Sequence, residues 1–271
     1  MLEARNMGTT KPFSRFTGIL MGVEGSGKSR LAVTARKPVL VLDWDMRAEA
    51  LAGLKDVYAL TFTDKPWPAQ PTACGEGLDI LAKLEASRDI STWGIFDVPA
   101  GTTIRTIVDD SITVHAKRIM ASGLYGSPGI RREINFGSGK GATQVQVPKS
   151  FDGWGAEMSA VEEYVLRLLA IKDLDVILTM HESAEEAPDS TQEQPKFTGK
   201  VCPFPVRHGR LMKYFNEVWR LKRESGPEPS IQFQPNYQFT SKSGLILDGI
   251  KVKPDIEYLI NESAKKTNTT K

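Results

Sequence analysis

The sequence has few residues that could form covalent or metal cross-links. Its 271 residues include only two cysteines, Cys74 and Cys202, and three histidines. The cysteines lie far apart without a Cys-x-x-Cys pair, which favours reduced thiols over a disulfide framework. The histidines lack the spacing of metal ligands, which argues against a structural zinc site. We therefore expect a hydrophobic core to hold the fold, and 40% hydrophobic residues are enough to form one.

Long apolar runs and a strong excess of one charge are also lacking. Residues 17–23 and 39–42 are apolar runs far shorter than the roughly 20 residues of a membrane span, and residues 1–14 have no signal-peptide core. The 35 Lys and Arg residues nearly balance the 33 Asp and Glu residues, and the net charge of +2 excludes a histone-like binder. This balance still allows a local basic patch. We expect a soluble cytoplasmic protein with no membrane partner.

Segments typical of strands alternate with segments typical of helices. Strands are expected at residues 16–21, 38–45, 104–108, 176–180, 218–221, 230–240 and 244–252. Helices are expected at residues 29–34, 46–54, 78–88, 112–122, 152–171 and 255–264. This alternation predicts an α/β fold with a mainly parallel sheet and a C-terminal β-hairpin extension. We expect a flexible arm at residues 1–14, one domain at 15–260 and a flexible tail at 261–271.

The segment after the first expected strand matches the P-loop pattern G-x-x-x-x-G-K-[ST]. It reads Gly22-Val23-Glu24-Gly25-Ser26-Gly27-Lys28-Ser29. Glycines let backbone N–H groups converge on phosphate oxygens, where side chains would block the approach. The lysine can reach the β- and γ-phosphates, and the last serine can bind Mg²⁺. We therefore predict that ATP is bound by Gly22, Glu24, Gly25, Ser26, Gly27, Lys28, Ser29 and Arg30.

Two other expected strands end in carboxylates that could act beside the P-loop. Residues 106–108 are followed by Asp109 and Asp110, which could complete the Mg²⁺ shell or cap the following helix. Adjacent strand residues point to opposite faces, so the period of the strand alone does not say which acid faces the metal. Asp45, at the end of residues 38–45, could orient the attacking water or cap the next helix.

With these motifs in this order, the sequence resembles the RecA-type ATPases, and among them the compact phage-encoded nucleotide-binding or single-strand-annealing ATPases. The likeness covers about residues 15–260, and its most specific part is the P-loop. It implies a RecA-like P-loop NTPase core that uses ATP and Mg²⁺ and acts in phage recombination, annealing or replication. It also implies a homo-oligomer, as a ring or filament with the nucleotide at subunit interfaces, and single-stranded DNA as a partner. A phage-encoded protein would work in the host cytoplasm.

The resemblance also implies roles for residues outside the P-loop. Asp110 matches the aspartate of the Mg²⁺ shell, and Asp45 occupies the position where these enzymes usually have a catalytic glutamate. His181, just after residues 176–180, resembles the polar residue that senses the γ-phosphate. Lys251 and Lys253 resemble basic residues inserted into a neighbour's nucleotide site. The catalytic set is then Lys28, Asp45 and His181, and the metal ligands are Ser29 and Asp110.

Two positions depart from the family pattern. Asp45 is one methylene shorter than the usual glutamate, which favours slow hydrolysis, and Asp109 stands where an apolar residue is usual. Slow hydrolysis leaves open an ATP-dependent DNA-binding assembly module with negligible turnover. A helicase or packaging motor is the other alternative.

A basic, glycine-rich stretch at residues 123–150 is the predicted DNA-binding loop. Arg131, Arg132 and Lys140 lie in it, and its basic residues outnumber its single acid, Glu133. Such a segment suits the phosphate backbone of a single strand, which RecA-type proteins bind at a comparable place. The alternative is a solvated surface loop.

Overall fold

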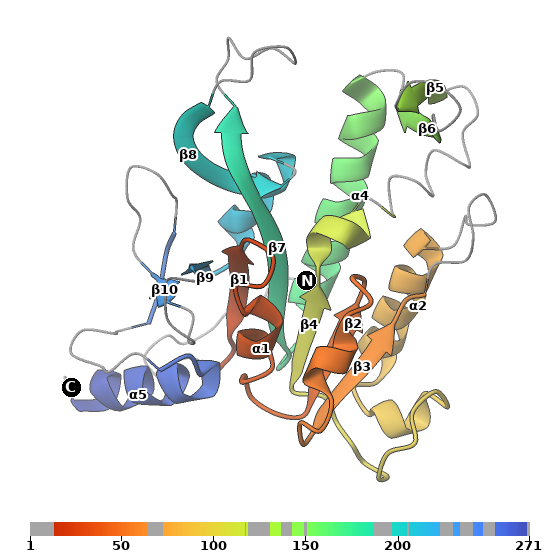
Figure 1. Ribbon diagram of the computed structural model, residues 1–271. Coiled ribbons are helices and arrows are strands. Elements are labelled where there is room, and N and C mark those ends of the chain that lie inside the picture. The colour runs from red at the N-terminus through yellow and green to blue at the C-terminus, as the bar shows by residue number, and fades with distance from the viewer. Residues whose placement is uncertain are drawn as a thin grey trace, which may run out of the picture.

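A central β-sheet covered by helices on both faces organises the chain in the computed structural model (Figure 1). The structure describes residues 14–63, 73–116, 118, 131–136, 143–148, 151–186, 197–204, 206–222, 230–233, 241–245 and 253–269. The sheet consists of β1 (Thr17–Gly22), β2 (Val39–Asp43), β3 (Val57–Thr61), β4 (Thr106–Asp110), β7 (Asp175–Glu186), β8 (Phe197–Phe204), β9 (Glu217–Lys222) and β10 (Ser230–Gln232).

The strand order is β10-β9-β1-β7-β4-β2-β3, with β8 paired to β7. The pairs from β9 through β3 are all parallel. β10 runs antiparallel to β9, and β8 antiparallel to β7. The predicted α/β fold, with a mainly parallel sheet and an antiparallel C-terminal pair, is confirmed.

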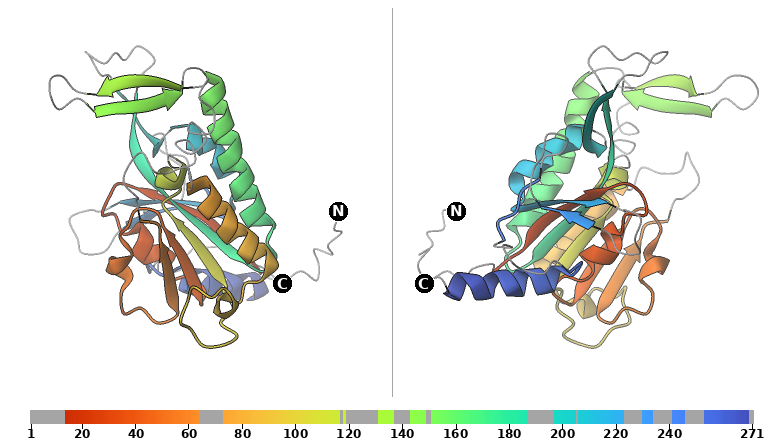
Figure 2. Two further views of the ribbon diagram at one scale, coloured as in Figure 1. Left: turned by 90° about the vertical axis from the view of Figure 1, so that its right-hand side faces the viewer. Right: turned by 60° about the vertical axis from the view of Figure 1, so that its left-hand side comes forward.

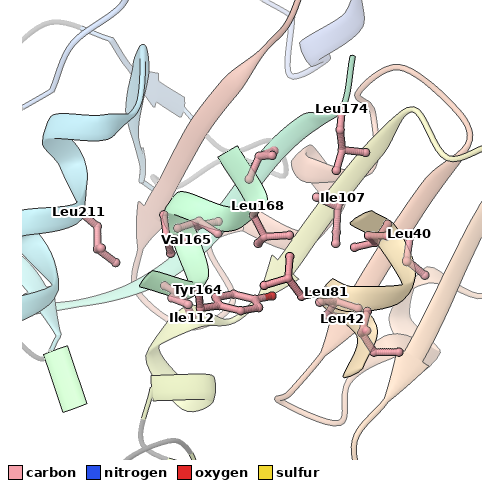
Figure 3. Close-up of a cluster of buried hydrophobic side chains, with 14 of the residues drawn as sticks. Leu40, Leu42, Leu81, Ile107, Ile112, Tyr164, Val165, Leu168, Leu174 and Leu211 are labelled. Atoms are coloured by element: carbon pink, nitrogen blue, oxygen red, sulfur yellow. The ribbon is translucent and has the colours of Figure 1, made fainter. Parts of the chain in front are cut away.

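Helices cover the two faces of the sheet and divide the core into two layers. α1 (Lys28–Ala32) and α5 (Ile256–Thr269) cover one face, while α2 (Ala73–Ala86), α4 (Phe151–Ala170) and the 3₁₀ helix η4 (Val206–Tyr214) cover the other. Figure 3 shows the layer under α2 and α4, where side chains from both helices meet those of the strands. All five residues of β2 are buried, as expected for a strand covered on both faces. In the described part of the chain, no helix is long and apolar enough to cross a membrane.

A separate two-stranded hairpin stands beyond one end of α4, away from the main sheet (Figure 2). Its strands are β5 (Arg131–Phe136) and β6 (Thr143–Pro148), paired antiparallel. This part of residues 123–150 was expected to be irregular, and that expectation is wrong. The alternation of Ile134 and Phe136, and of Val145 and Val147, has the period of strands, but the neighbouring glycines obscure it in the sequence.

Two other expectations about local structure are wrong. The helix expected at residues 46–54 is only a short 3₁₀ helix, η1 (Ala48–Leu51), and β3, which the sequence analysis missed, follows it. Met46 has φ 56°, outside the helical range, so a helix cannot include it. At the C-terminal end, α5 continues to Thr269, so most of the tail expected at 261–271 is helical.

Candidate active site

The P-loop and the acidic residues identified in the sequence meet at one edge of the sheet. β1, β2, β4 and β7 run parallel, so their carboxyl ends share that edge, where ligands bind in open α/β sheets. Gly22 of β1 is in register with His181 of β7, and Asp43 of β2 with Asp110 of β4. Residues from distant parts of the sequence therefore form one candidate site.

The P-loop has a backbone shape that its glycines make possible. Gly25 and Gly27 have φ 72° and 92°, in the left-handed region that favours glycine. A Cβ atom on Gly22 would lie 2.6 Å from the Leu221 carbonyl oxygen and 2.6 Å from the Ser26 hydroxyl. Any side chain at Gly22 would therefore displace the loop or β9.

Lys28 lies folded back against the start of the P-loop. Its Nζ atom donates hydrogen bonds to the carbonyl oxygens of Gly22 and Val23, both at 2.9 Å. Burial lowers the pKa of the Lys28 ammonium, and nearby carboxylates, Asp110 first among them, oppose this shift. A buried ammonium satisfied only by carbonyl oxygens can exchange them for a charged phosphate oxygen, which is the stronger partner.

Asp110 ends β4 on the P-loop side of the sheet. Its carboxylate accepts hydrogen bonds from the Ser29 hydroxyl and from Thr179 Oγ1, the latter at 2.5 Å. Burial raises the pKa of Asp110, and these two hydrogen bonds oppose the shift. The structure thus brings together the two residues predicted to bind Mg²⁺, Ser29 and Asp110.

Asp109 lies on the opposite face of β4 and does not take part in this arrangement. Its Oδ2 atom accepts hydrogen bonds from the Tyr164 hydroxyl and interacts with His115 Nδ1, each at 2.9 Å. Its side chain is fully buried in the layer under α2 and α4. Asp110 thus lies beside the P-loop and Asp109 in the core.

Asp45 lies just beyond β2 and is bonded to His181. Its Oδ2 atom is 3.2 Å from His181 Nε2, and its Oδ1 atom accepts the Ser111 hydroxyl at 2.9 Å. Burial raises the pKa of Asp45, but the hydrogen bonds from His181 and Ser111 outweigh burial and place this pKa below its ordinary value. His181 Nδ1 also lies 3.9 Å from a carboxylate oxygen of Glu24.

Asp43, rather than Asp45, caps the backbone N–H groups after β2. The Asp43 carboxylate accepts the backbone N–H groups of Arg47 at 3.0 Å and of Ala48 at 2.9 Å. It also accepts the Thr61 hydroxyl at 3.0 Å. Asp43 therefore holds the turn after β2, and Asp45 is left to face the P-loop and His181.

A pocket of about 790 Å³ opens beside the P-loop. Its lining includes Gly25, Ser26, Gly27 and Arg30, all predicted ATP-binding residues. The rest of the lining comes from the remainder of α1 and the residues after it, from Leu54, and from the segment before and at the start of α5, including Pro254, Asp255 and Glu257. Its volume is that of a small-molecule site.

Of the residues predicted to bind DNA or to act in a neighbouring subunit, only Lys253 has a described side chain. Arg131 and Arg132 begin β5, of which only the backbone is described, and Lys140 and Lys251 lie outside the described residues. Lys253 is exposed next to the pocket, with its Nζ atom 4.9 Å from the centre of the Tyr258 ring. A role for Lys251 or Lys253 in a neighbouring subunit therefore stays a prediction.

Three supporting residues were missed by the sequence analysis. Thr179 bonds Asp110, Ser111 bonds Asp45, and the Thr113 hydroxyl accepts the backbone N–H of His181 at 3.1 Å. Thr179 could have been found, because it lies two residues before His181 and therefore on the same face of the strand. Ser111 and Thr113 lie at the turn and in the first residues of the helix after β4; the sequence predicts a helix there, but not which of its side chains face the site.

One comparison with known proteins identifies the family of this chain. The protein-family model described as "AAA domain" matches residues 14–245. A crystal structure of the RadB recombinase is similar over 78% of this chain and 76% of that one, with 15% identity and a TM-score of 0.35. A search among curated proteins gave no match.

Proposed function

The chain belongs to the AAA-domain family and is a P-loop ATPase, and from this premise we propose a finer function of RecA type. We propose that it is a Mg²⁺-dependent ATPase that assembles as a homo-oligomer and binds single-stranded DNA in phage recombination, annealing or replication. The observation that carries the hydrolytic part is the convergence of Lys28, Asp110 and Asp45 on one edge of the sheet.

The residues present fit ATP with Mg²⁺. Glycine at position 22 lets the P-loop pack tightly against β9, where a Cβ atom would clash with the Leu221 carbonyl oxygen and with Ser26, and the buried Ser26 hydroxyl oxygen has no hydrogen-bond partner. A phosphate oxygen is a suitable partner for such a group. Ser29 and Asp110 would hold the Mg²⁺, which supplies charge neutralisation on the phosphates when bound. The adjoining pocket has room for the nucleoside.

Each side chain of the site has a role that follows from its contacts. Lys28 would exchange its carbonyl partners for the γ-phosphate and neutralise charge that develops there. Asp45 would orient the attacking water, because a carboxylate with a lowered pKa stays ionised and accepts a hydrogen bond from that water. His181, between Asp45 and Glu24, would link the γ-phosphate to the water-orienting carboxylate.

Exposed apolar side chains at the rim of the site support assembly. Val23 in the P-loop is 50% exposed and Met46, directly after Asp45, is 47% exposed. Large apolar groups at the edge of a polar site are typical of surfaces that another chain covers. A second copy would cover them and would bring its Lys251 or Lys253 to the nucleotide.

The hairpin beyond α4 is the proposed DNA-binding element. Arg131 and Arg132 start β5, and Lys140 belongs to the segment that connects β5 to β6. Basic residues on an element that stands away from the sheet suit the phosphate backbone of a single strand.

The test is steady-state ATP hydrolysis with and without single-stranded DNA, with Lys28→Ala as the blank. We expect DNA to stimulate turnover in the wild type. Both Lys28→Ala and Asp45→Asn should abolish turnover, and Asp45→Asn should still bind ATP. Arg131→Ala/Arg132→Ala should weaken DNA binding at low salt and leave DNA-free turnover unchanged. Unchanged nucleotide binding in Lys28→Ala would refute the ATP site, and unchanged DNA affinity in the double variant would refute the hairpin.

A second candidate is an ATP-dependent assembly module with negligible hydrolysis. The short Asp45 side chain, already bonded to His181, favours it. ATP binding and assembly without turnover would support this candidate over the first. Directional strand displacement driven by ATP would instead identify a translocating motor.

A further inference from the structure

A buried polar cluster lies on the far face of the sheet, directly behind the candidate site. Asp109, His115 and Tyr164 have at most 2% of their surface exposed, and they come from β4, the helical segment at residues 112–116 and α4. Both the Tyr164 hydroxyl and the His115 ring bond the same oxygen of Asp109, Oδ2, and the other oxygen, Oδ1, is buried without a hydrogen-bond partner. In Figure 3 the Tyr164 hydroxyl points into the core layer.

This cluster is not explained by stability. A carboxylate taken out of water with one oxygen unsatisfied costs free energy, and apolar residues of similar size at such positions are often as stable or more so. Hydrogen bonds require a defined geometry, whereas apolar packing alone permits small shifts of a strand against a helix. The cluster fixes the end of β4 against α4 at a defined position.

The cluster also reaches the segment that carries Asp45. The His115 ring is stacked on Trp44, with ring centres 3.8 Å apart and planes at 12°, and its other neighbour is the edge of Tyr164 at 4.6 Å. Trp44 is held on its second side by Phe62, stacked at 3.7 Å. Space for His115 exists because α2 has glycine at position 77, where a Cβ atom would lie 2.8 Å from His115 Nε2.

Trp44 connects the two site carboxylates through the backbone. It precedes Asp45 directly, and its N–H donates to the Asp110 carbonyl oxygen at 2.8 Å. Displacement of the Trp44 ring or of Asp109 would therefore move the backbone of both Asp45 and Asp110.

We propose that Asp109, His115 and Tyr164 are positioning residues for ATP hydrolysis, which fix Asp110 and Asp45 from the opposite face of the sheet. The inference rests on the proposed roles of those two carboxylates. None of the three residues is among those proposed to bind the nucleotide. Their effect passes through β4 and Trp44.

The test compares Tyr164→Phe, which deletes only the hydroxyl, with Tyr58→Phe on β3 at the edge of the same core layer. For Tyr164→Phe we expect kcat to fall, or the Mg²⁺ concentration for half-maximal turnover to rise, by about 10-fold, the usual effect of losing a group behind a metal ligand. ATP affinity without Mg²⁺ should stay unchanged in both variants, and Tyr58→Phe should match the wild type. Wild-type kcat and Mg²⁺ dependence in Tyr164→Phe would overturn the proposal.

A second variant separates positioning from stability. Asp109→Leu/His115→Phe/Tyr164→Phe replaces the whole cluster by apolar groups and should keep the melting temperature while losing turnover. A stable triple variant with wild-type turnover would also overturn the proposal, and if this variant does not fold, Tyr164→Phe alone decides. Wild-type turnover that is insensitive to Lys28→Ala would instead refute the proposed function, so the two failures are distinguishable.

Discussion

The hydroxyl of Thr179 allows a direct test of the proposed Mg²⁺ site, because it donates its hydrogen bond to Asp110. Thr179 is fully buried on β7, and its Oγ1 atom donates to Asp110 Oδ1 at 2.5 Å. Thr179→Val keeps the shape and removes this hydrogen bond. A hydrogen bond to a charged group contributes about 1.5–3 kcal/mol, which corresponds to about 10- to 100-fold in metal affinity.

The pH dependence of this loss has a definite sign. Burial raises the pKa of Asp110, and the hydrogen bonds from Ser29 and Thr179 oppose that rise. Without the Thr179 bond the pKa of Asp110 rises further, and a protonated carboxyl does not bind Mg²⁺. The Thr179→Val defect should therefore be larger at low pH and become smaller as the pH is raised.

The assay is a Mg²⁺ titration of ATP turnover at fixed ATP and at two pH values. Thr106→Val is the matched control, since Thr106 is equally buried and its hydroxyl donates to the Arg36 carbonyl at 2.5 Å at the other end of β4. We expect normal Mg²⁺ dependence in Thr106→Val. If Thr179→Val matches it at both pH values, Asp110 does not hold the metal in the way described.

Two further predictions concern the P-loop and a buried acid far from it. Gly22→Ala should weaken ATP binding in an equilibrium titration, because its Cβ atom would lie 2.6 Å from the Leu221 carbonyl oxygen; unchanged affinity would show that the loop can shift freely. Glu217 accepts the Trp219 indole N–H at 2.8 Å and the Gly244 backbone N–H at 2.7 Å through different oxygens. Because a glutamine has only one acceptor oxygen, Glu217→Gln should lower the free energy of unfolding in urea by about 1–3 kcal/mol. Burial raises the pKa of Glu217, so the stability advantage of the wild type over Glu217→Gln should be largest at acidic pH and decrease as the pH rises through that pKa. A constant advantage would contradict the burial effect.

The parts of the fold that local patterns specify were predictable from the sequence. The P-loop requires glycines at fixed spacing next to a strand, and the buried strand at 39–43 requires a continuous apolar run. The amphipathic period of residues 152–171 was sufficient to predict α4. In each case one stretch of chain contains the whole signal, and the structure confirms all three elements.

The elements that were missed depend on partners distant in the sequence. β3 has two intermediate residues at its start and alternates in exposure after them, so its strand character becomes evident only beside β2. The helix cannot start at residue 46 because Met46 has a non-helical φ, and Asp43 instead holds the turn before η1 through the N–H groups of Arg47 and Ala48. Neither effect has a composition signal.

The pair Asp109–Asp110 shows where sequence reasoning reaches its limit in this site. The strand period requires the two carboxylates to lie on opposite faces, so one of them had to enter the core if β4 was covered on both sides. Which one did so was decided by the register of β4 against β7, where Asp109 is paired with Leu178. That register places Asp110 beside Thr179 and the P-loop, and Asp109 among His115 and Tyr164. The core accommodates an acid at a position that is usually apolar, because it supplies Asp109 with its own hydrogen-bond partners. The role of Asp110 at the metal stays a prediction.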